Sequence, residues 1–216
     1  MADDVKARRP YHAPRRAEQT AATRRAVLDA ARELFTTRGY AATTVAQLAE
    51  RAGVAVDTVY ALVGRKPVVL RELVETAISG TDQAVPAEER DYVRALRAAP
   101  SAGEKIDLYA AALAGMGPRT APVFLALRDA AARDPACAAL HAEITERRAA
   151  NMGLFAQDLR TTGELRADLS DTDVADIVWS MNAADFYALL VHQRGWTPER
   201  YGAFLADAWK RVLLDP

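Results

Sequence analysis

Two short helical segments joined by a tight turn are the feature of this sequence that most constrains its fold. Thr44 and Gln47 have the spacing of a capping box, in which two side chains satisfy free N–H groups at a helix start. Apolar residues at helical spacing continue to residue 52, and Gly53 can adopt the left-handed conformation that ends a helix. A second helical stretch follows at about 56–63. Short helices joined in this way predict a helix-turn-helix.

The remainder of the chain is also predicted to be helical. Alanine is abundant, and the β-branched and aromatic residues that favour strands are sparse. Gly117-Pro118 and Asp134-Pro135 mark breaks between helices, and Ser170 and Thr197 are predicted N-caps. We expect an all-α fold of about ten helices, at residues 18–38, 44–52, 56–63, 67–79, 87–98, 102–116, 119–133, 136–162, 171–193 and 198–214.

Charge is distributed unevenly along the chain. Residues 1–66 contain 12 Lys and Arg against 7 Asp and Glu, whereas residues 67–216 contain 16 against 22. A basic first third suits a DNA-facing surface, and an acidic remainder implies a different role. We therefore expect a disordered basic arm at 1–17, a helix-turn-helix domain at 18–66 and a helical domain at 67–216. The arm is either a solvated tail or a segment that follows the DNA backbone or enters the minor groove.

The segment Thr43–Leu70 reads TTVAQLAERAGVAVDTVYALVGRKPVVL. It resembles the N-terminal domain of TetR-family (tetracycline-repressor-like) regulators in the pattern TT-V-x-x-L-A-x-x-A-G-V, then T-V-Y, then a lysine at the start of the next helix. The resemblance implies a three-helix DNA-binding domain joined to a helical domain for ligand binding and dimerisation. It also implies a sequence-specific transcriptional regulator that binds double-stranded operator DNA as a homodimer.

The second helix of the motif is expected to read DNA. Val54, Val59 and Val63 suit its packed face, which leaves the opposite face and the N-terminal half for the major groove. The resemblance places phosphate contacts at Thr44, Tyr60 and Lys66. The predicted DNA-binding residues are Thr43, Thr44, Val56, Asp57, Thr58, Tyr60, Ala61 and Lys66.

Four positions depart from the family pattern. Leu62 and Val63 stand where histidine and phenylalanine are frequent, so a histidine contact to DNA is absent. Ala55 and Arg65 stand where the two following helices usually have capping serines.

For the helical domain, the resemblance implies a ligand pocket among the middle helices and a dimer interface on the last two long helices. Candidate pocket residues are Tyr109, Met116, Phe124, Arg128, Met152 and Phe155, for each of which ordinary core packing is the alternative. Wide apolar faces on the last helices give the candidate interface residues Ile177, Val178, Met181, Leu189, Tyr201, Phe204, Leu205, Ala208 and Val212, for which use inside the monomer core is the alternative.

Other function classes find little support. His12, His141 and His192 lie in separate regions, and the sequence has no phosphate-binding glycine loop. We expect no enzymatic activity, no cofactor, no metal, no membrane span and a cytoplasmic location. The expected function is that of a repressor released from its operator by a small-molecule effector. The alternatives are a regulator controlled by a protein partner or without a ligand and, last, an all-helical enzyme.

Overall fold

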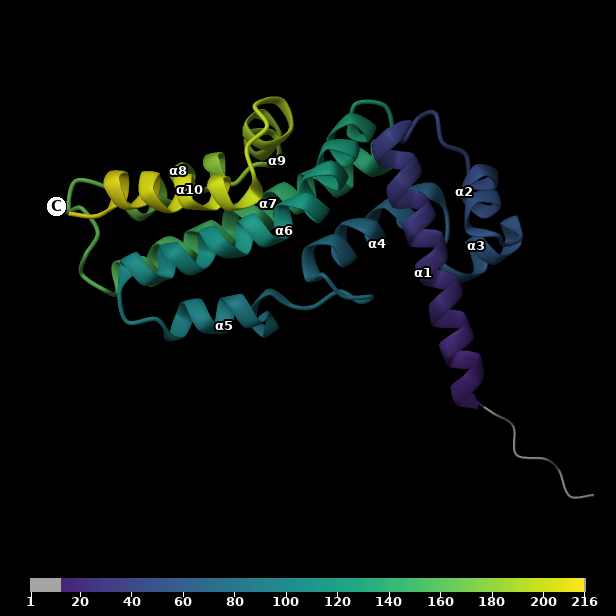
Figure 1. Ribbon diagram of the computed structural model, residues 1–216, viewed down its shortest axis with the longest axis horizontal. Helices are drawn as coiled ribbons and strands as arrows, with labels where there is room; N and C mark the ends of the chain where they lie inside the picture. The colour runs from purple at the N-terminus through teal and green to yellow at the C-terminus, as the bar shows by residue number, and fades with distance from the viewer. Residues whose placement is uncertain (1–12, 216) are drawn as a thin grey trace, which may run out of the picture.

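The computed structural model describes residues 13–215, which form an all-helical molecule (Figure 1), as predicted. No strand occurs among these residues. The elements are α1 (Ala13–Thr37), α2 (Val45–Ala52), α3 (Val56–Leu62), α4 (Lys66–Ser79), the short 3-10 turn η1 (Ala87–Glu89), α5 (Asp91–Ala98), α6 (Ala102–Ala131), α7 (Pro135–Arg160), α8 (Asp171–Met181), α9 (Ala184–Tyr187), the π-helical segment η2 (Ala188–Gln193) and α10 (Pro198–Leu213).

Two hydrophobic cores lie along the molecule. The first is built from α1 to α4 and is completed by the end of α6 and the start of α7, for example by Leu127 and Leu140. The second is built from α5, the first half of α6, the second half of α7, and α8 to α10, with Trp209 and Leu205 fully buried at its centre. The long helices α6 and α7 therefore belong to both cores and connect them (Figure 1).

Several helix starts follow the predicted caps. The Thr44 hydroxyl accepts from the Gln47 N–H at 3.2 Å, and the Gln47 side chain accepts from the Thr44 N–H at 2.9 Å. The Ser170 hydroxyl caps α8, and the Thr197 hydroxyl caps α10. These side chains satisfy N–H groups that have no partner inside their own helices.

The helix α6 corrects one sequence prediction. A break was expected at Gly117-Pro118, but one helix runs from Ala102 to Ala131 with Pro118 and Pro122 inside it. Each proline lacks the N–H that would bond four residues back, which weakens the helix. The helix continues because α10, α7, α4, α5 and α9 pack against it along its length, and this tertiary packing outweighs the local propensity.

The segment after Ser170 corrects another prediction. A single helix was expected at 171–193, but α8 ends at Met181 and the chain turns at Asn182 and Ala183 before α9 begins. Two smaller differences concern other boundaries. The helix α1 begins at Ala13 and so includes the last part of the predicted arm, and the helix expected at 87–98 is divided into η1 and α5. Residues 1–12 of that arm lie outside the described residues.

The helix α6 is long and apolar enough by composition to cross a membrane, and it is the one described helix for which this holds by itself. The bent pair formed by α8 and residues 184–193 passes the same test only if counted as one span. Residues of α6 contribute to both cores, and 39% of its apolar window is buried inside the protein.

Gly117 provides a test of this packing. A Cβ atom at this position would lie 2.2 Å from Cε2 of Tyr187, whereas a Cβ atom at Gly115, in the same helix, would meet nothing within 4 Å. We predict that Gly117→Ala lowers the free energy of unfolding by about 1–3 kcal/mol through overpacking. The control Gly115→Ala should raise it by up to about 1 kcal/mol, because alanine favours helix more than glycine does. Urea unfolding of both variants measures this, and equal effects would contradict the close contact.

Candidate nucleic-acid interface and ligand cavity

The orientation of α3 is set by its buried face. Val59 is completely buried, and Val54 and Val63 pack against the same core, as predicted. Gly53 has a φ of +69° and forms the turn that brings α3 against α2, because its N–H reaches back to the carbonyl groups at the end of α2. This packing turns the opposite face of α3 outward.

The outward face carries most of the predicted reading residues. Val56, Asp57, Tyr60 and Ala61 are exposed, and Thr58 is half-buried. Tyr60 retains 49% of its accessible surface, although it is an aromatic residue in a small domain. Val56 is also exposed, at 38%, so the outward face of α3 carries two large apolar side chains.

The structure corrects the prediction that Thr43 is a DNA-binding residue. Its side chain is 1% exposed, and its hydroxyl donates to the Gly39 carbonyl at 2.9 Å. It therefore holds the turn between α1 and α2 and is not part of the outward surface. Thr44, the next residue, is exposed and caps α2.

Lys66 was predicted to contact a phosphate, but its side chain also binds groups within the protein. Its Nζ donates to the carbonyl groups of Tyr40 and Thr43, both at 2.8 Å, and lies 4.1 Å from the centroid of the Tyr40 ring. Burial lowers the pKa of this ammonium group. Two of its three N–H groups thus stabilise the turn before α2, and at most one is left for a phosphate.

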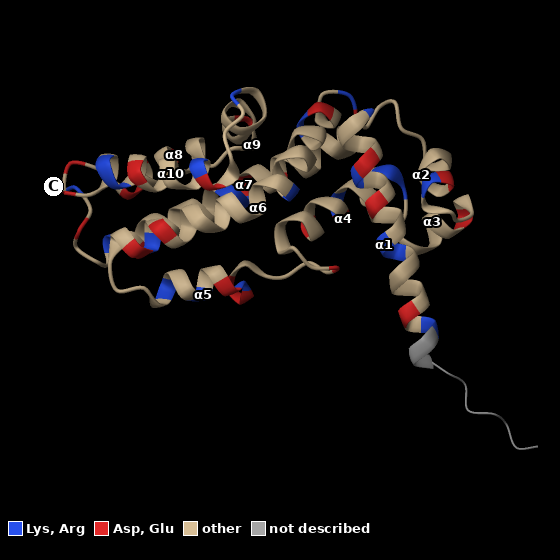
Figure 2. Cartoon of the chain, viewed as in Figure 1, with Lys and Arg blue, Asp and Glu red and all other residues tan. Residues whose placement is uncertain are grey.

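The other basic residues of this end differ in their availability. Basic and acidic residues are intermixed over the described chain (Figure 2). Arg24, Arg25 and Arg51 form ion pairs with Glu72, Asp82 and Glu33, respectively. Arg65, in contrast, is exposed at the start of α4 and its side chain makes no capping hydrogen bond. From the sequence, Arg65 was identified only as a departure from the family pattern. In the structure it is an accessible cation three residues after the end of α3.

A hydrogen bond joins the helix-turn-helix to the helical domain. The Tyr40 hydroxyl, in the turn after α1, donates to Oδ2 of Asp134 at 2.8 Å. This bond is the largest cause that lowers the pKa of Asp134, which also caps α7 by accepting from the Ala136 N–H. Burial raises the pKa of Tyr40, so it remains a hydrogen-bond donor. The turn before α2 is thus tied to the start of α7.

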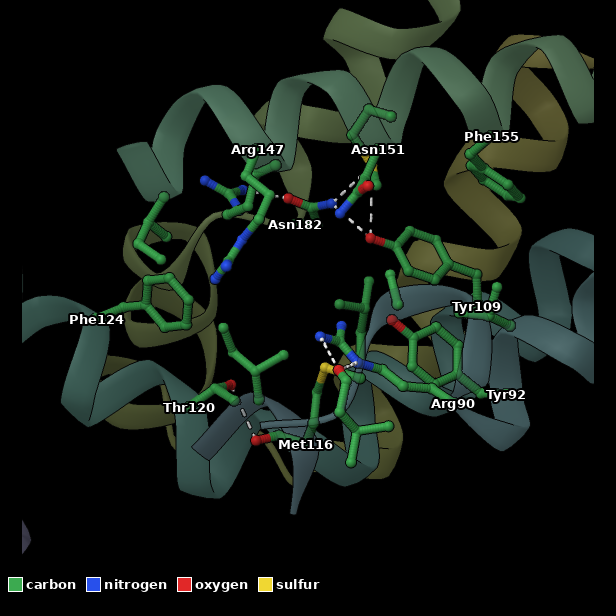
Figure 3. Close-up of a pocket in the computed structure, with 18 of the residues that line it drawn as sticks. Arg90, Tyr92, Tyr109, Met116, Thr120, Phe124, Arg147, Asn151, Phe155 and Asn182 are labelled. Atoms are coloured by element: carbon green, nitrogen blue, oxygen red, sulfur yellow. Dashed lines mark hydrogen bonds between the residues drawn. The ribbon is translucent and has the colours of Figure 1, made fainter. Parts of the chain in front are cut away.

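The helical domain contains a cavity of about 780 Å³, bounded by α4, α5, α6, α7 and the turn between α8 and α9 (Figure 3). This volume is in the range of cavities that bind small molecules. Five of the six predicted pocket residues line it: Tyr109, Met116, Phe124, Met152 and Phe155. The sixth, Arg128, does not. It is exposed and forms ion pairs with Asp129 and Asp185.

Polar residues of the cavity wall were not predicted from the sequence. Arg147, Arg148 and Asn151 lie on α7, and Asn182 lies in the turn after α8. Arg148 is four residues before Met152 and seven before Phe155, a spacing that places the three on one helical face and could have indicated it. Asn182 carried no such signal, because the end of α8 was not expected at this position.

The predicted interface residues on the last helices divide into three groups. Val178, Tyr201 and Leu205 are buried in the monomer core, which corrects their assignment to an interface. Leu189, Phe204 and Val212 are exposed, at 49%, 38% and 40% of their accessible surface, although they are large apolar residues. Ile177, Met181 and Ala208 are half-buried. An apolar surface therefore remains on α8 to α10.

The chain combines an outward-facing helix-turn-helix with a helical domain that contains a cavity. Residues 27–62 match the family model described as bacterial regulatory proteins, tetR family. This match runs from within α1 to the end of α3, so the helix-turn-helix is similar to the N-terminal part of that family.

Solved structures agree with this fold over nearly the whole chain. A putative transcriptional regulator from Saccharomonospora viridis in complex with choline has a TM-score of 0.66 at 17% identity, covering 89% of this chain and 98% of that one. The SmeT–triclosan complex has a TM-score of 0.65 at 19% identity, covering 90% and 92%. NalD, the secondary repressor of the MexAB-OprM multidrug efflux pump in Pseudomonas aeruginosa, has a TM-score of 0.65 at 20% identity, covering 93% and 98%. No protein of curated function matches this chain in sequence.

Proposed function

We propose that this protein is a sequence-specific repressor that binds operator DNA as a homodimer and is released by a small molecule in the cavity. The observation that carries the proposal is the sharing of elements between the two sites. Arg71, Glu75 and Ile78 of α4 line the cavity, while other residues of α4 belong to the core on which α2 and α3 pack. Occupation of the cavity therefore acts on a helix that supports the DNA-binding surface.

Each exposed residue of α3 has a defined role in the proposed complex. Asp57 would repel phosphate and so is assigned to a base edge, where a carboxylate accepts from the amino group of cytosine. Val56 and Ala61 offer apolar contacts of the kind made with thymine methyl groups. Tyr60 and Arg65 contact the phosphate backbone, with Thr44 and the free N–H groups at the start of α2 beside them.

The exposed apolar surface on α8 to α10 supports the proposed homodimer. Leu189, Phe204 and Val212 would be covered by the same residues of a second copy related by a twofold axis. A twofold pair of recognition helices reads two half-sites about 34 Å apart, in successive major grooves. The helices α8 to α10 do not need to rearrange for the dimer to form, because Leu189, Phe204 and Val212 are already exposed.

In the proposed release from DNA, α6 would transmit the effect of a bound ligand to α1 and α4. Met116, Gly117 and Thr120 of this helix line the cavity. Between them, Arg119 donates to the Ala77 carbonyl near the end of α4 at 2.8 Å, and its own carbonyl accepts from Arg32 of α1 at 2.8 Å. A ligand that prefers one position of this segment shifts α1 and α4 together, and it lowers DNA affinity by its differential affinity for the two states. The neighbours with bound choline and triclosan support such a role for the cavity.

Selection of bound sites from a random duplex library tests the proposal. The expected result is a palindromic consensus whose affinity falls steeply as salt rises, since phosphate contacts release counterions. A folded protein that enriches no sequence would contradict the proposed function.

Two substitutions test the phosphate contacts. We predict that Tyr60→Ala and Arg65→Gln each weaken binding to the selected duplex about 5- to 30-fold, and weaken binding to unrelated duplexes by a similar factor. Arg65→Gln should also make the slope of log affinity against log salt about one unit shallower. The matched control is Arg94→Gln on α5, which removes the same charge from an exposed site in the other domain. Fluorescence anisotropy measures all three, and equal losses in Arg65→Gln and the control would assign the effect to net charge alone.

A third substitution tests the dimer surface. We predict that Phe204→Glu converts the dimer to a monomer at micromolar concentration, because it places a charge in an apolar interface. Sedimentation velocity measures the change, and circular dichroism checks that the helices remain. Asp207→Gln, one turn away on α10, is the control. A dimer that persists in Phe204→Glu would place the interface elsewhere.

A further inference from the structure

Arg148 is a half-buried cation on the cavity wall, and among the described residues it has no carboxylate partner. Its Nη2 donates to the Trp179 carbonyl at 3.2 Å and to the side-chain oxygen of Asn182. Both acceptors are neutral. Within the described chain, Nε and Nη1 have no hydrogen-bond acceptor, and the guanidinium lies 5.4 Å from the centroid of the Trp179 ring. Burial lowers the pKa of Arg148, so its charge is held at a cost that no neighbouring anion offsets.

Other cations around the cavity are neutralised. Arg147 pairs with Glu75 at 2.8 Å, and Arg71 pairs with Glu143 at 2.6 Å. The buried Lys105 pairs with Asp158 at 2.8 Å. The acidic groups Glu75, Glu143 and Asp158 of the wall are thus already engaged. Arg90 donates to the Val85 carbonyl and adds a second positive charge without a carboxylate partner in the described structure. Arg97 and Glu88 also line the cavity, and no ion pair is formed by either of them within the described residues. Three arginines without a carboxylate partner, Arg90, Arg97 and Arg148, thus outnumber one unpaired carboxylate, and the free charge of the wall is positive.

A second donor lies beside Arg148. The Tyr109 hydroxyl accepts from Nδ2 of Asn182 at 2.9 Å, so its own proton must point elsewhere. The acceptor it finds within the protein is Sδ of Met152, at 3.5 Å, and a thioether is a weak acceptor. The Asn182 amide binds Arg148 through its oxygen and Tyr109 through its nitrogen, and it therefore holds both donors in one part of the cavity wall. Figure 3 shows Asn182 and Tyr109 joined there by a hydrogen bond.

Apolar side chains make up much of the remaining wall and include Ile78, Val93, Leu96, Leu113, Phe124 and Ile144. Polar groups lie among them, since Arg90, Thr120 and the Arg147–Glu75 pair also line the cavity. A molecule that fills the cavity would therefore meet unpaired donors and positive charge beside Asn182 and hydrocarbon over much of its remaining surface.

We propose that the effector of this protein is an amphipathic monoanion, with a carboxylate bound between Arg148 and Tyr109 and an apolar body in the remaining cavity. The inference rests on the proposed function, since it names the class of molecule that would occupy the effector site. A carboxylate offers acceptors to Nε and Nη1 of Arg148, and it offers the Tyr109 hydroxyl a stronger acceptor than the Met152 thioether. It also neutralises the half-buried guanidinium.

Matched ligands test the head group without knowledge of the natural effector. The probes are straight-chain carboxylates of six to fourteen carbons, each paired with the primary alcohol and the primary amine of the same length. Isothermal titration calorimetry on the full chain gives the affinities. We expect a carboxylate of at least one length to bind about tenfold or more tightly than its alcohol, and the amine to bind most weakly.

Substitutions at Arg148 and at the neighbouring Arg147 test whether Arg148 contacts the carboxylate or only supports the structure. Arg148→Gln should reduce the preference for carboxylate over alcohol to less than about threefold while alcohol binding persists, and Arg148→Lys should keep part of the preference. The matched control is the double variant Glu75→Gln with Arg147→Gln, because it removes both members of an ion pair from the same wall and leaves the net charge of the wall unchanged. This variant should keep the full preference. If no carboxylate binds more tightly than its alcohol, including the case in which no probe binds, the inference is overturned. It is also overturned if the double variant and Arg148→Gln lose the preference equally.

Failure of the proposed function would look different. If carboxylates bind with the expected preference but leave the affinity for the selected duplex unchanged, the head-group inference stands and ligand-controlled release is wrong. If DNA release occurs with alcohols and amines as readily as with acids, the repressor function stands and the inference about the effector is wrong.

Discussion

The packing of α6 against nearly all the other long helices is the constraint on which the rest of the structure depends. Its first half contributes Ile106 and Tyr109 to one core, and its second half contributes Val123 and Leu127 to the other. The cavity lies along the middle of the same helix, from Tyr109 to Phe124. One continuous element therefore connects the cavity to the core on which α2 and α3 pack.

This arrangement explains why the weak middle of α6 is tolerated. The segment around Gly117, Pro118 and Pro122 lacks two N–H donors and includes a residue without a side chain, so its own helix stability is low. Close packing of Tyr187 against Gly117 and the hydrogen bonds of Arg119 compensate. The middle of α6 is stabilised mainly by contacts with other elements. It is therefore suited to shift when a ligand in the cavity changes those contacts.

The sequence predicted the helix-turn-helix well because its signals are local. The capping box of Thr44 and Gln47, the left-handed Gly53 and the buried Val59 each act within a few residues. Features that depend on distant contacts were not predicted. The continuity of α6 results from packing on several sides, and the burial of Tyr201 results from the fold of the whole domain. The polar end of the cavity was missed for the same reason, since Asn182 reaches Arg148 and Tyr109 only because α8 ends where it does.

The central claim is that the DNA-binding surface and the cavity are coupled through α6, and binding linkage is reciprocal. Amide hydrogen exchange of the full chain, with and without the selected duplex, tests this claim most directly. The account predicts that DNA changes the exchange rates not only in α2 and α3 but also at residues 115–122 of α6 and 182–187 beside the cavity. Changes confined to residues 13–62 would mean that the two sites are uncoupled, and would contradict the account.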